Sequence, residues 1–382
     1  MVATVRAMQL GEVIRFANGK SIKPGGDGCY PVYGSNGIIG HCDEFRYENG
    51  IIIGRVGAYC GSVAYCPERF WPSDNTLVAF PASDEFDTKF LFYLLHNTKL
   101  SRYAGGAAQP LVTQTVLKQV EVEVPPLTTQ RRIAGILSAY DELIKNNQRR
   151  IKILEEMVRS LYREWFVHFH FPGHDKVKMV PSPLGPIPQG WEVKRLGEVA
   201  DVNRAQINPR TAPLEVHYID ISSVSPGQID AIITYPFDDA PGRARRIVQH
   251  GDILWSCVRP NRRSHALVMQ PVLNTIASTG FAVLTATKVP FSFLYLATTT
   301  DDFVTFLTNS ATGSAYPAVS AKTFEDAVLL IPPSPLLKKF GETTIPMAEQ
   351  THILQRQAQN LRRTRGLLLP RLLSGEMPNL YA

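Results

Sequence analysis

The chain has 382 residues, of which 44% are hydrophobic and 19% are charged, and its formal net charge is +6 at pH 7. This length allows two or three domains, and the composition excludes a disordered chain. No run approaches the ~18 apolar residues of a membrane span and the N-terminus lacks the apolar core of a signal peptide, so we expect a cytoplasmic protein without a membrane partner. The positive charge permits an acidic partner but does not identify one.

Residues 1–128 predict a domain rich in short strands. β-branched runs that are interrupted by glycines, such as Gly50–Tyr65, are typical of strands and turns. Between them, Lys89–Asn97 reads as a short amphipathic helix and Gly105–Thr113 as a glycine- and proline-containing loop. The domain is expected to end with a strand at Val120–Pro126.

Residues 129–170 predict one long helix. Its seam residues follow one another by alternating steps of four and three, which is the spacing of a helix that packs lengthwise on another helix. They are Ile133, Leu137, Tyr140, Ile144, Asn147, Ile151, Leu154, Val158, Leu161 and Trp165. At about 1.5 Å per residue the seam is roughly 50 Å long, which favours a paired helix over a core helix of one globular domain. Asn147 is the one polar seam residue and is expected to fix the register of the pair.

Residues 171–190 are rich in proline and glycine, so we expect a linker without helix or strand. Beyond it, residues 191–334 repeat the first domain. The string LGEV occurs at Leu10 and again at Leu196, and two pairs of prolines are each 207 residues apart. These pairs are Pro110 with Pro317 and Pro125 with Pro332. Several matches in the same order predict an internal duplication.

The same offset places a second and weaker seam within residues 335–382. Besides Phe340, its members are Met347, Leu354, Ala358, Leu361, Leu368 and Leu372. Thr344, Thr351 and Arg365 interrupt it, and Pro346 should kink or start the helix, so we expect its continuous part after Pro346. The predicted fold is α+β, with two similar strand-rich domains separated by two long helices that form an antiparallel intramolecular coiled coil.

No motif for catalysis or metal binding stands out. The sequence lacks G-x-x-x-x-G-K-[ST], G-x-S-x-G, H-E-x-x-H and the amino-methyltransferase motif, which Asn208-Pro209-Arg210 does not fit. His168, His170 and His174 are separated by phenylalanines and a Pro-Gly turn, which favours packing over metal ligation. The five cysteines form no paired C-x-x-C units, so reduced thiols are favoured over zinc or disulfides. They are Cys29, Cys42, Cys60, Cys66 and Cys257.

Side chains suited to DNA recognition are better represented. Arginine, asparagine and glutamine can form two hydrogen bonds with one base, and arginine also holds phosphates. The candidates in the first domain are Lys20, Tyr33, Ser35, Asn36, Arg55 and Tyr59. Those in the second domain are Arg204, Gln206, Asn208, Arg210, Arg243, Arg245, Arg246, Arg259, Asn261, Arg262 and Arg263. Single polar loop residues are often merely solvated, so the set is more informative than any one member.

Several strings together resemble the specificity subunit of a type I restriction–modification system. They are YPVYGSNGIIG at Tyr30–Gly40, GRVGAYCGSV at Gly54–Val63, PPLTTQRRI at Pro125–Ile133, GDILWSCVRPN at Gly251–Asn261 and LLPRLLSGE at Leu368–Glu376. The resemblance covers nearly the whole chain. It implies two target-recognition domains, each of which reads one half of a bipartite sequence in double-stranded DNA.

The resemblance also implies partners and cofactors. Two modification subunits, which are adenine-N6 methyltransferases, are expected to dock on the long helices, and restriction subunits join that core. The chain itself would be non-catalytic and hold no cofactor, because S-adenosylmethionine, ATP and Mg belong to the partner subunits. The second copy departs from the pattern at Pro332–Phe340, where PPSPLLKKF lacks the glutamine of the first copy. A strictly symmetric docking surface is therefore not expected.

Two other classes of function stay open. One is a self-contained DNA methyltransferase or nuclease, against which the missing motifs argue. The other is a coiled-coil interaction protein without DNA readout. A rigid spacer of roughly 50 Å compares with about 3.4 Å per base pair, so two DNA readers at its ends could stand on the order of fifteen base pairs apart or somewhat less.

Overall fold

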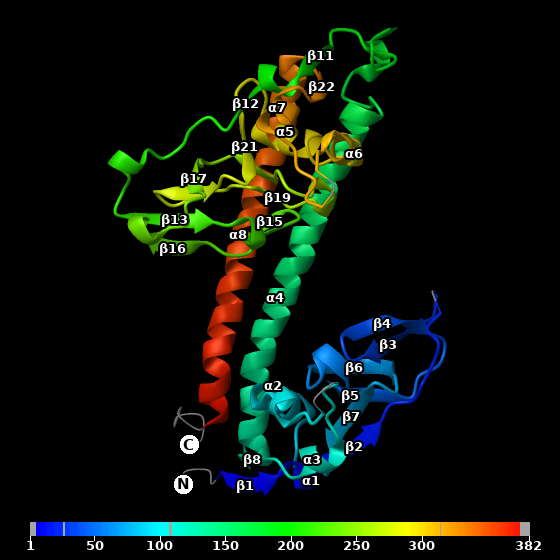
Figure 1. Cartoon of the computed structure of the whole chain (residues 1–382). Helices are drawn as coiled ribbons and strands as arrows, with labels where there is room; N and C mark the ends of the chain where they lie inside the picture. Colours follow the sequence, from blue (N-terminus) through cyan, green and yellow to red (C-terminus); the bar gives the residue numbers. More distant parts are fainter. Residues whose placement is uncertain (1–4, 26, 107–108, 314, 375–382) are drawn as a thin grey trace. The chain divides into compact units, whose positions relative to one another are not determined.

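The computed structural model describes residues 5–25, 27–106, 109–313 and 315–374 (Figure 1). Residues 375–382, which include the end of the string LLPRLLSGE, lie outside the described residues. The chain divides into two compact units: unit 1 comprises residues 1–147 and 356–382, and unit 2 comprises residues 148–355. Each unit contains part of both long helices, α4 (Leu127–Tyr162) and α8 (Ser334–Leu373). No described helix is both long and apolar enough to span a membrane.

Unit 1 is built on a six-stranded sheet with the strand order β2-β7-β5-β6-β3-β4. Its strands are β2 (Ile14–Asn18), β3 (Tyr30–Gly34), β4 (Gly37–Cys42), β5 (Tyr47–Gly54), β6 (Val63–Pro72) and β7 (Thr76–Pro81). Neighbouring strands are antiparallel except for β3 and β6, which run parallel. Three successive isoleucines of β5, Ile51 to Ile53, are buried, so this strand is covered on both faces.

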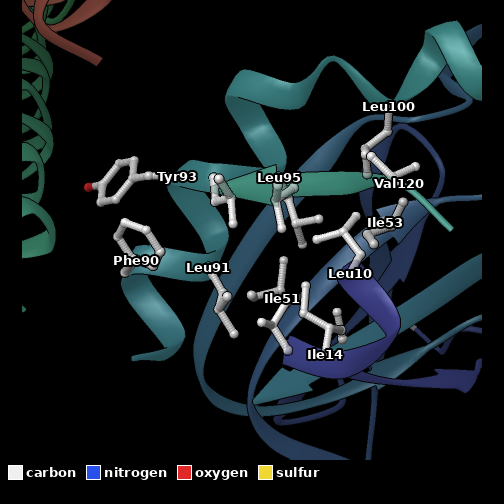
Figure 2. Packing of buried hydrophobic residues seen from close by; sticks show 14 of the residues in the cluster. Leu10, Ile14, Ile51, Ile53, Phe90, Leu91, Tyr93, Leu95, Leu100 and Val120 are labelled. Carbon is white, nitrogen blue, oxygen red and sulfur yellow. The ribbon is translucent and has the colours of Figure 1, made fainter. Parts of the chain in front are cut away.

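Helix α2 (Thr88–Thr98) covers one face of this sheet, and it corresponds to the helix predicted at Lys89–Asn97. Its first turn is capped by Asp87, whose carboxylate accepts the Phe90 N–H at 2.9 Å. Figure 2 shows Leu91 and Leu95 of α2 in one cluster with the sheet residues Ile51 and Ile53. This cluster is the main apolar core of unit 1.

A second small sheet joins the core of unit 1 to the long helix α4. Strand β1 (Arg6–Gln9) pairs antiparallel with β8 (Glu121–Val124). Next to it, α1 (Leu10–Val13) packs against α3 (Gln114–Lys118). Helix α4 follows β8 almost at once, so the fold of unit 1 fixes where the long helix begins.

Unit 2 contains two four-stranded sheets, with the strand orders β12-β21-β18-β19 and β16-β13-β20-β17. The first comprises β12 (Ala200–Val202), β21 (Phe281–Ala286), β18 (Ile253–Ser256) and β19 (His265–Leu267). The second comprises β16 (Ile233–Pro236), β13 (Glu215–Ile219), β20 (Thr275–Ser278) and β17 (Ala244–Ile247). Smaller pairs are β11 (Glu192–Arg195) with β22 (Val328–Ile331), β14 (Val224–Ser225) with β15 (Gln228–Ile229), and β9 (Met179–Val180) with β10 (Ile187–Pro188). The helices are α5 (Phe291–Ala297), α6 (Asp301–Ser310) and α7 (Ala321–Glu325).

The two units share topology as well as sequence. Strands β12-β21-β18-β19 repeat the order of β2-β7-β5-β6, and β11-β22 repeats β1-β8. The loops repeat as well: the Gly57 N–H donates to Pro110 O at 3.0 Å, and the Arg259 N–H donates to Pro317 O at 2.8 Å. The two prolines are the pair that the 207-residue offset relates. Each copy therefore holds its loops on the same arrangement of four strands and a strand pair, which we call the backbone frame.

Within unit 1, the beginning of α4 packs against the end of α8. Ile133 and Leu137 share a buried cluster with Leu369 and Leu372. Further along α4, the Asp141 carboxylate forms an ion pair with Arg365, which lies earlier in α8. Residues further along α4 therefore contact residues earlier in α8, so these two helix segments run antiparallel.

Within unit 2, the other halves of the two helices meet in the same sense. Phe340 of α8 packs against Phe166, with ring centroids 4.8 Å apart, and against Trp165 at 5.8 Å. Leu154 of α4 and Thr351 of α8 line one cavity. Helix α4 ends at Tyr162, and a π-helical turn, Arg163–Val167, carries Trp165 and Phe166.

The expectation that the second helix becomes continuous only after Pro346 is wrong. Helix α8 begins at Ser334 and continues through Pro346. Proline removes one backbone donor, but packing fixes the turn that precedes it. Phe340 and Thr344 are fully buried, and the Thr344 hydroxyl bonds to Ser292 Oγ and Phe340 O, both at 2.8 Å. Thr344 thus breaks the apolar pattern without disturbing the helix.

The proline-rich segment after α4 is packed and partly ordered into short elements. It contains a 3-10 turn at His174–Lys176 and the two-residue ribbon of β9 and β10. The expectation that proline excludes strand here is therefore wrong for this ribbon. Phe171 and Ile187 are buried in the core of unit 2, and their burial holds the segment in place.

The glutamine that distinguishes the two copies lies inside unit 1. Gln130 is fully buried, and its amide nitrogen donates to Glu85 O at 3.1 Å and Pro125 O at 2.9 Å. Its amide oxygen accepts the Asp87 N–H at 2.9 Å. Leu337, 207 positions later, is also buried. The difference between the copies exchanges internal hydrogen bonds for apolar packing and does not alter an exposed side chain.

Candidate nucleic-acid interface

Four candidates of the first domain, Ser35, Asn36, Arg55 and Tyr59, lie in the loops near the end of strand β5. The Ser35 hydroxyl donates to Asn75 O at 2.8 Å, and the Arg55 N–H donates to the same carbonyl at 2.9 Å. The Ser62 hydroxyl donates to Ser35 O at 2.6 Å. These bonds join the β3–β4 turn, the β5–β6 loop and the β6–β7 turn. Asn36 is exposed at the β3–β4 turn, at one edge of this group of loops.

Close packing holds the same loops together. A Cβ atom on Gly54 would lie 2.4 Å from Ser62 Oγ and 2.5 Å from Tyr59 O, so only glycine permits this approach. The Tyr59 side chain itself is 60% exposed. An exposed tyrosine beside a half-buried arginine, Arg55, offers both a stacking surface and a positive charge to a ligand.

Two further candidates of the first domain lie in different surroundings. Tyr33 is buried in β3 and packs edge-on against Phe70, with ring centroids 5.8 Å apart. Burial raises the pKa of the Tyr33 hydroxyl well above its ordinary value, so this group stays neutral. Lys20 is exposed, and its N–H donates to Pro72 O at 2.9 Å beside the β6–β7 turn. Lys20 therefore adds positive charge near the loops, whereas Tyr33 supports the sheet beneath them.

Two candidate segments of the second domain pair with each other through their backbones. The Ile207 N–H donates to Arg245 O at 2.8 Å, and the Ile247 N–H donates to Ala205 O at 3.1 Å. A β-bridge also joins Gln206 to Arg246. The segment that carries Arg204, Gln206, Asn208 and Arg210 thus lies along β17, which carries Arg245 and Arg246. Arg243 directly precedes this strand, and Arg245 and Arg246 lie within it.

The side chains of these two segments differ in exposure. Those of Arg204, Gln206, Asn208, Arg210 and Arg243 are exposed. Arg245 is half-buried with its guanidinium 5.2 Å from the Phe237 ring centroid, and Arg246 is half-buried beneath the surface. Desolvation lowers the pKa of the Arg246 guanidinium. The exposed members can therefore reach a ligand, while Arg245 and Arg246 are held against the protein.

The third segment is the loop that follows β18. Arg259 has its guanidinium carbon 4.5 Å from the Tyr316 ring centroid, and its Nη2 donates to Ala315 O at 3.4 Å. Arg263 forms an ion pair with Asp301, the first residue of α6. Asn261 and Arg262 are exposed. Arg259 and Arg263, close in sequence, thus have different partners.

A single turn brings all three segments together. The Cys257 N–H donates to Gly280 O at 2.8 Å, and the Thr279 N–H donates to Arg243 O at 2.8 Å. The loop after β18 and the beginning of β17 therefore flank the turn between β20 and β21. Unit 2 presents its predicted arginines on one continuous group of loops.

Sequence reasoning missed two residues that support this group. Tyr316 is 66% exposed, and the Arg259 guanidinium lies over its ring. The sequence signal that could have found it is its place directly before Pro317, one of the prolines that the 207-residue offset relates. Asp252 is buried and accepts the Gln249 N–H at 2.8 Å and the Thr285 hydroxyl at 2.7 Å. Gln249 in turn accepts a bond from the Arg204 guanidinium. Burial raises the pKa of the Asp252 carboxyl.

Among the described residues, no group of three or more His, Cys, Asp or Glu side chains could hold a metal ion. The rings of His168 and His170 lie 6.1 Å apart, and those of His170 and His174 lie 5.5 Å apart. His170 contacts the Glu164 carboxylate at 2.9 Å. Cys60 is buried, and its thiol donates to Arg55 O at 3.2 Å. Burial raises the pKa of this thiol.

Comparison with known proteins shows what the chain is similar to. Residues 4–156 match the sequence model of the Type I restriction modification DNA specificity domain. The chain is similar to the Type I restriction enzyme MjaIX specificity subunit of Methanocaldococcus jannaschii, with 24% identity over 351 residues that cover 89% of this chain and 80% of that protein. It is also similar to the MjaVIII specificity subunit of the same organism, with 26% identity over 66% of this chain and 63% of that protein.

A solved structure shares the fold. The S subunit of a type I restriction–modification system from M. genitalium aligns with a TM-score of 0.66 over 97% of this chain and 96% of that chain, at 17% identity. The fold and the loops define a protein made of two copies of a strand-rich α+β unit, each combined with part of both long helices. Residues 4–156 thus match the type I specificity domain, and most of the chain is similar in sequence to a type I restriction enzyme specificity subunit.

Proposed function

We propose that this chain reads a bipartite sequence in double-stranded DNA for a type I restriction–modification complex and has no catalytic activity of its own. The observation that carries this proposal is that the two copies have the same backbone frame but different side chains in its loops. The loop after β5 in unit 1 and the loop after β18 in unit 2 are each bonded to a proline-containing loop. Unit 1 places Gly57 at this contact and unit 2 places Arg259 there. One frame with different loop residues suits two readers of different half-sites.

The proposed domains follow the sequence repeat. Residues 1–128 form the first target-recognition domain and residues 191–334 form the second. Residues 129–170 form the first long helix, residues 171–190 the connecting segment, and residues 335–382 the second long helix with its tail.

In this proposal α4 and α8 form an antiparallel coiled coil that sets the distance between the two readers. All predicted seam residues of both helices are buried or half-buried, which supports a continuous pair. Asn147 is among the buried members. A polar residue buried at one level of such a pair disfavours other registers, so the length of the spacer would be fixed.

The outer face of α4 is the proposed contact for the modification subunits. Ile153 and Met157, which are 44% and 50% exposed, lie one turn apart on this helix. Exposed apolar side chains on a paired helix are suited to a further protein partner. These partners would be adenine-N6 methyltransferases that bind S-adenosylmethionine, and restriction subunits would supply ATP- and Mg-dependent cleavage.

DNA binding in this proposal uses the two loop groups. Exposed side chains such as Asn36, Arg204 and Gln206 would contact base edges in the major groove. Lys20 and exposed arginines such as Arg210 would hold phosphates, which fixes the orientation of each domain on the duplex.

The test is reconstitution of the chain with modification subunits, followed by binding and methylation assays over a range of salt concentrations. We expect sequence-selective binding and methylation at one bipartite target. Absence of selective binding at every salt concentration would contradict the DNA-reading function and favour an interaction protein. Methyl transfer or cleavage by the purified chain alone would contradict a non-catalytic subunit.

A further inference from the structure

Two arginines in the loop after β18 have an unusual backbone conformation. Arg259 has φ +50° and Arg263 has φ +56°, in the left-handed region that residues with a Cβ atom rarely adopt. Such conformations persist only where the surrounding structure holds them, and they concentrate at functional sites. Arginine at these two positions, where glycine would be less strained, therefore points to a function for its side chain.

The first copy contains glycine at both corresponding positions. The Gly54 N–H donates to Ser62 O and the Ser256 N–H donates to Ser264 O, each at 2.9 Å, which aligns the two loops. In this alignment Gly57, with φ +76°, corresponds to Arg259, and Gly61, with φ +81°, corresponds to Arg263. The frame requires a left-handed residue at both positions, and unit 2 fills both with arginine.

The two arginines serve different purposes. The Arg263 guanidinium is neutralised by the Asp301 carboxylate. The Arg259 guanidinium has no carboxylate partner among the described residues; it lies 4.5 Å from the centre of the exposed Tyr316 ring, and its Nη2 reaches Ala315 O at 3.4 Å. Stacking on an aromatic ring restrains the plane of a guanidinium and leaves its in-plane donors available. Arg259 is therefore positioned before a ligand arrives.

We propose that Arg259 reads one guanine in the half-site bound by unit 2, by donating two hydrogen bonds to guanine N7 and O6 in the major groove. Tyr316 is the positioning residue that holds the guanidinium plane. This inference rests on the proposed DNA-reading function. Guanine is the base whose major-groove edge offers two adjacent acceptors, and a planar guanidinium fork matches them. Unit 1 has Gly57 at this place and reads its half-site without such a contact.

The test compares Arg259→Gly with the matched variant Arg263→Gly in the complex reconstituted with modification subunits. Glycine suits both left-handed positions, so both variants should fold, which thermal unfolding checks. Methylation sequencing of the wild-type complex first defines the target. Duplexes then carry 7-deazaguanine, which lacks the N7 acceptor, at each guanine of the target in turn.

We expect one guanine, in one half-site only, at which 7-deazaguanine weakens DNA binding by the wild-type complex about 10-fold, because the contact contributes roughly 10- to 100-fold to affinity. At the same guanine, DNA binding by the Arg259→Gly complex should hardly change. Arg263→Gly should keep the wild-type sensitivity, and Tyr316→Ala should reduce it. A target half-site of unit 2 without guanine would overturn the inference, as would equal sensitivity in Arg259→Gly. Uniform weakening on all sequences with a smaller salt dependence would assign Arg259 to a phosphate instead and also overturn it. Loss of selectivity in the wild-type complex would instead contradict the proposed function.

Discussion

Replacing Gln130 by leucine, the residue that the second copy has at this place, should loosen the contact between α2 and the start of α4. The change removes three hydrogen bonds, to Glu85 O, Pro125 O and the Asp87 N–H. At about 0.5–1.5 kcal/mol for each bond the loss is roughly 1.5–4.5 kcal/mol, and leucine recovers about 1 kcal/mol through added apolar burial. We expect a net loss of roughly 0.5–3.5 kcal/mol. Asp87 caps α2, so this helix should respond most.

Hydrogen exchange measured on the full chain provides a local assay of this change. Amides in α2 such as that of Leu91, which donates to Asp87 O at 2.9 Å, should lose protection, while amides in unit 2 should not. Gln148→Leu is the matched control, because Gln148 is exposed on the same helix. If Gln130→Leu changes α2 protection no more than Gln148→Leu does, then these bonds do not stabilise unit 1 and the reasoning fails.

The remaining predictions concern modularity, spacing and pH. If the proposed function holds, exchanging residues 1–128 for the first domain of a type I specificity subunit should change one half of the methylated target, and a change in both halves would contradict independent readers. Inserting one heptad after Asn147 in α4 and one after Gln355 in α8 should lengthen the unread gap by about three base pairs, since seven residues add about 10 Å; methylation sequencing would show an unchanged gap if the coil is not the spacer. Burial lowers the pKa of His265 to about 4, below its ordinary value of 6.5. The neutral form is therefore favoured in the folded state, so this stabilisation is present above pH 6.5 and is lost as the pH falls towards 4. The loss should be roughly 3 kcal/mol, and His265→Phe should remove that part of the pH dependence of unfolding while keeping the ring beside Trp255.

Local pattern is sufficient to predict elements whose cause is local. The spacing of apolar residues predicts the long helix that the structure shows as α4, because a heptad repeat requires no knowledge of the partner. The same rule treats Arg365 as an interruption of the second seam. In the structure Arg365 pairs with Asp141, 224 positions away, and Asp141 also accepts the Tyr93 hydroxyl at 2.6 Å. A contact at that separation has no signature in a local pattern.

The candidate loops show a similar division. Composition predicts which strings are polar and flexible, but it does not predict that 204–210 lies along 243–246, because backbone pairing across a long intervening segment depends on the whole sheet. Tyr33 illustrates the opposite case. It belongs to the polar string YGSNG, yet it is the last large side chain of β3 and packs into the sheet. A residue at a strand end can face the core while its neighbours in the turn face solvent.

The correspondence between Gly57 and Arg259 shows how one duplicated backbone accommodates two different side chains. A loop that needs a left-handed residue imposes a backbone conformation, and glycine meets that need without strain. Arginine meets it at a cost that the surrounding contacts must offset, here the bonds to the loop around Pro317 and the stacking on Tyr316. Because the frame tolerates both residues, the side chain at this position can change without altering the fold. If the proposed DNA-reading function holds, a duplicated frame of this kind can acquire a second specificity through substitutions at a few loop positions, while the strand order and the long helices remain unchanged.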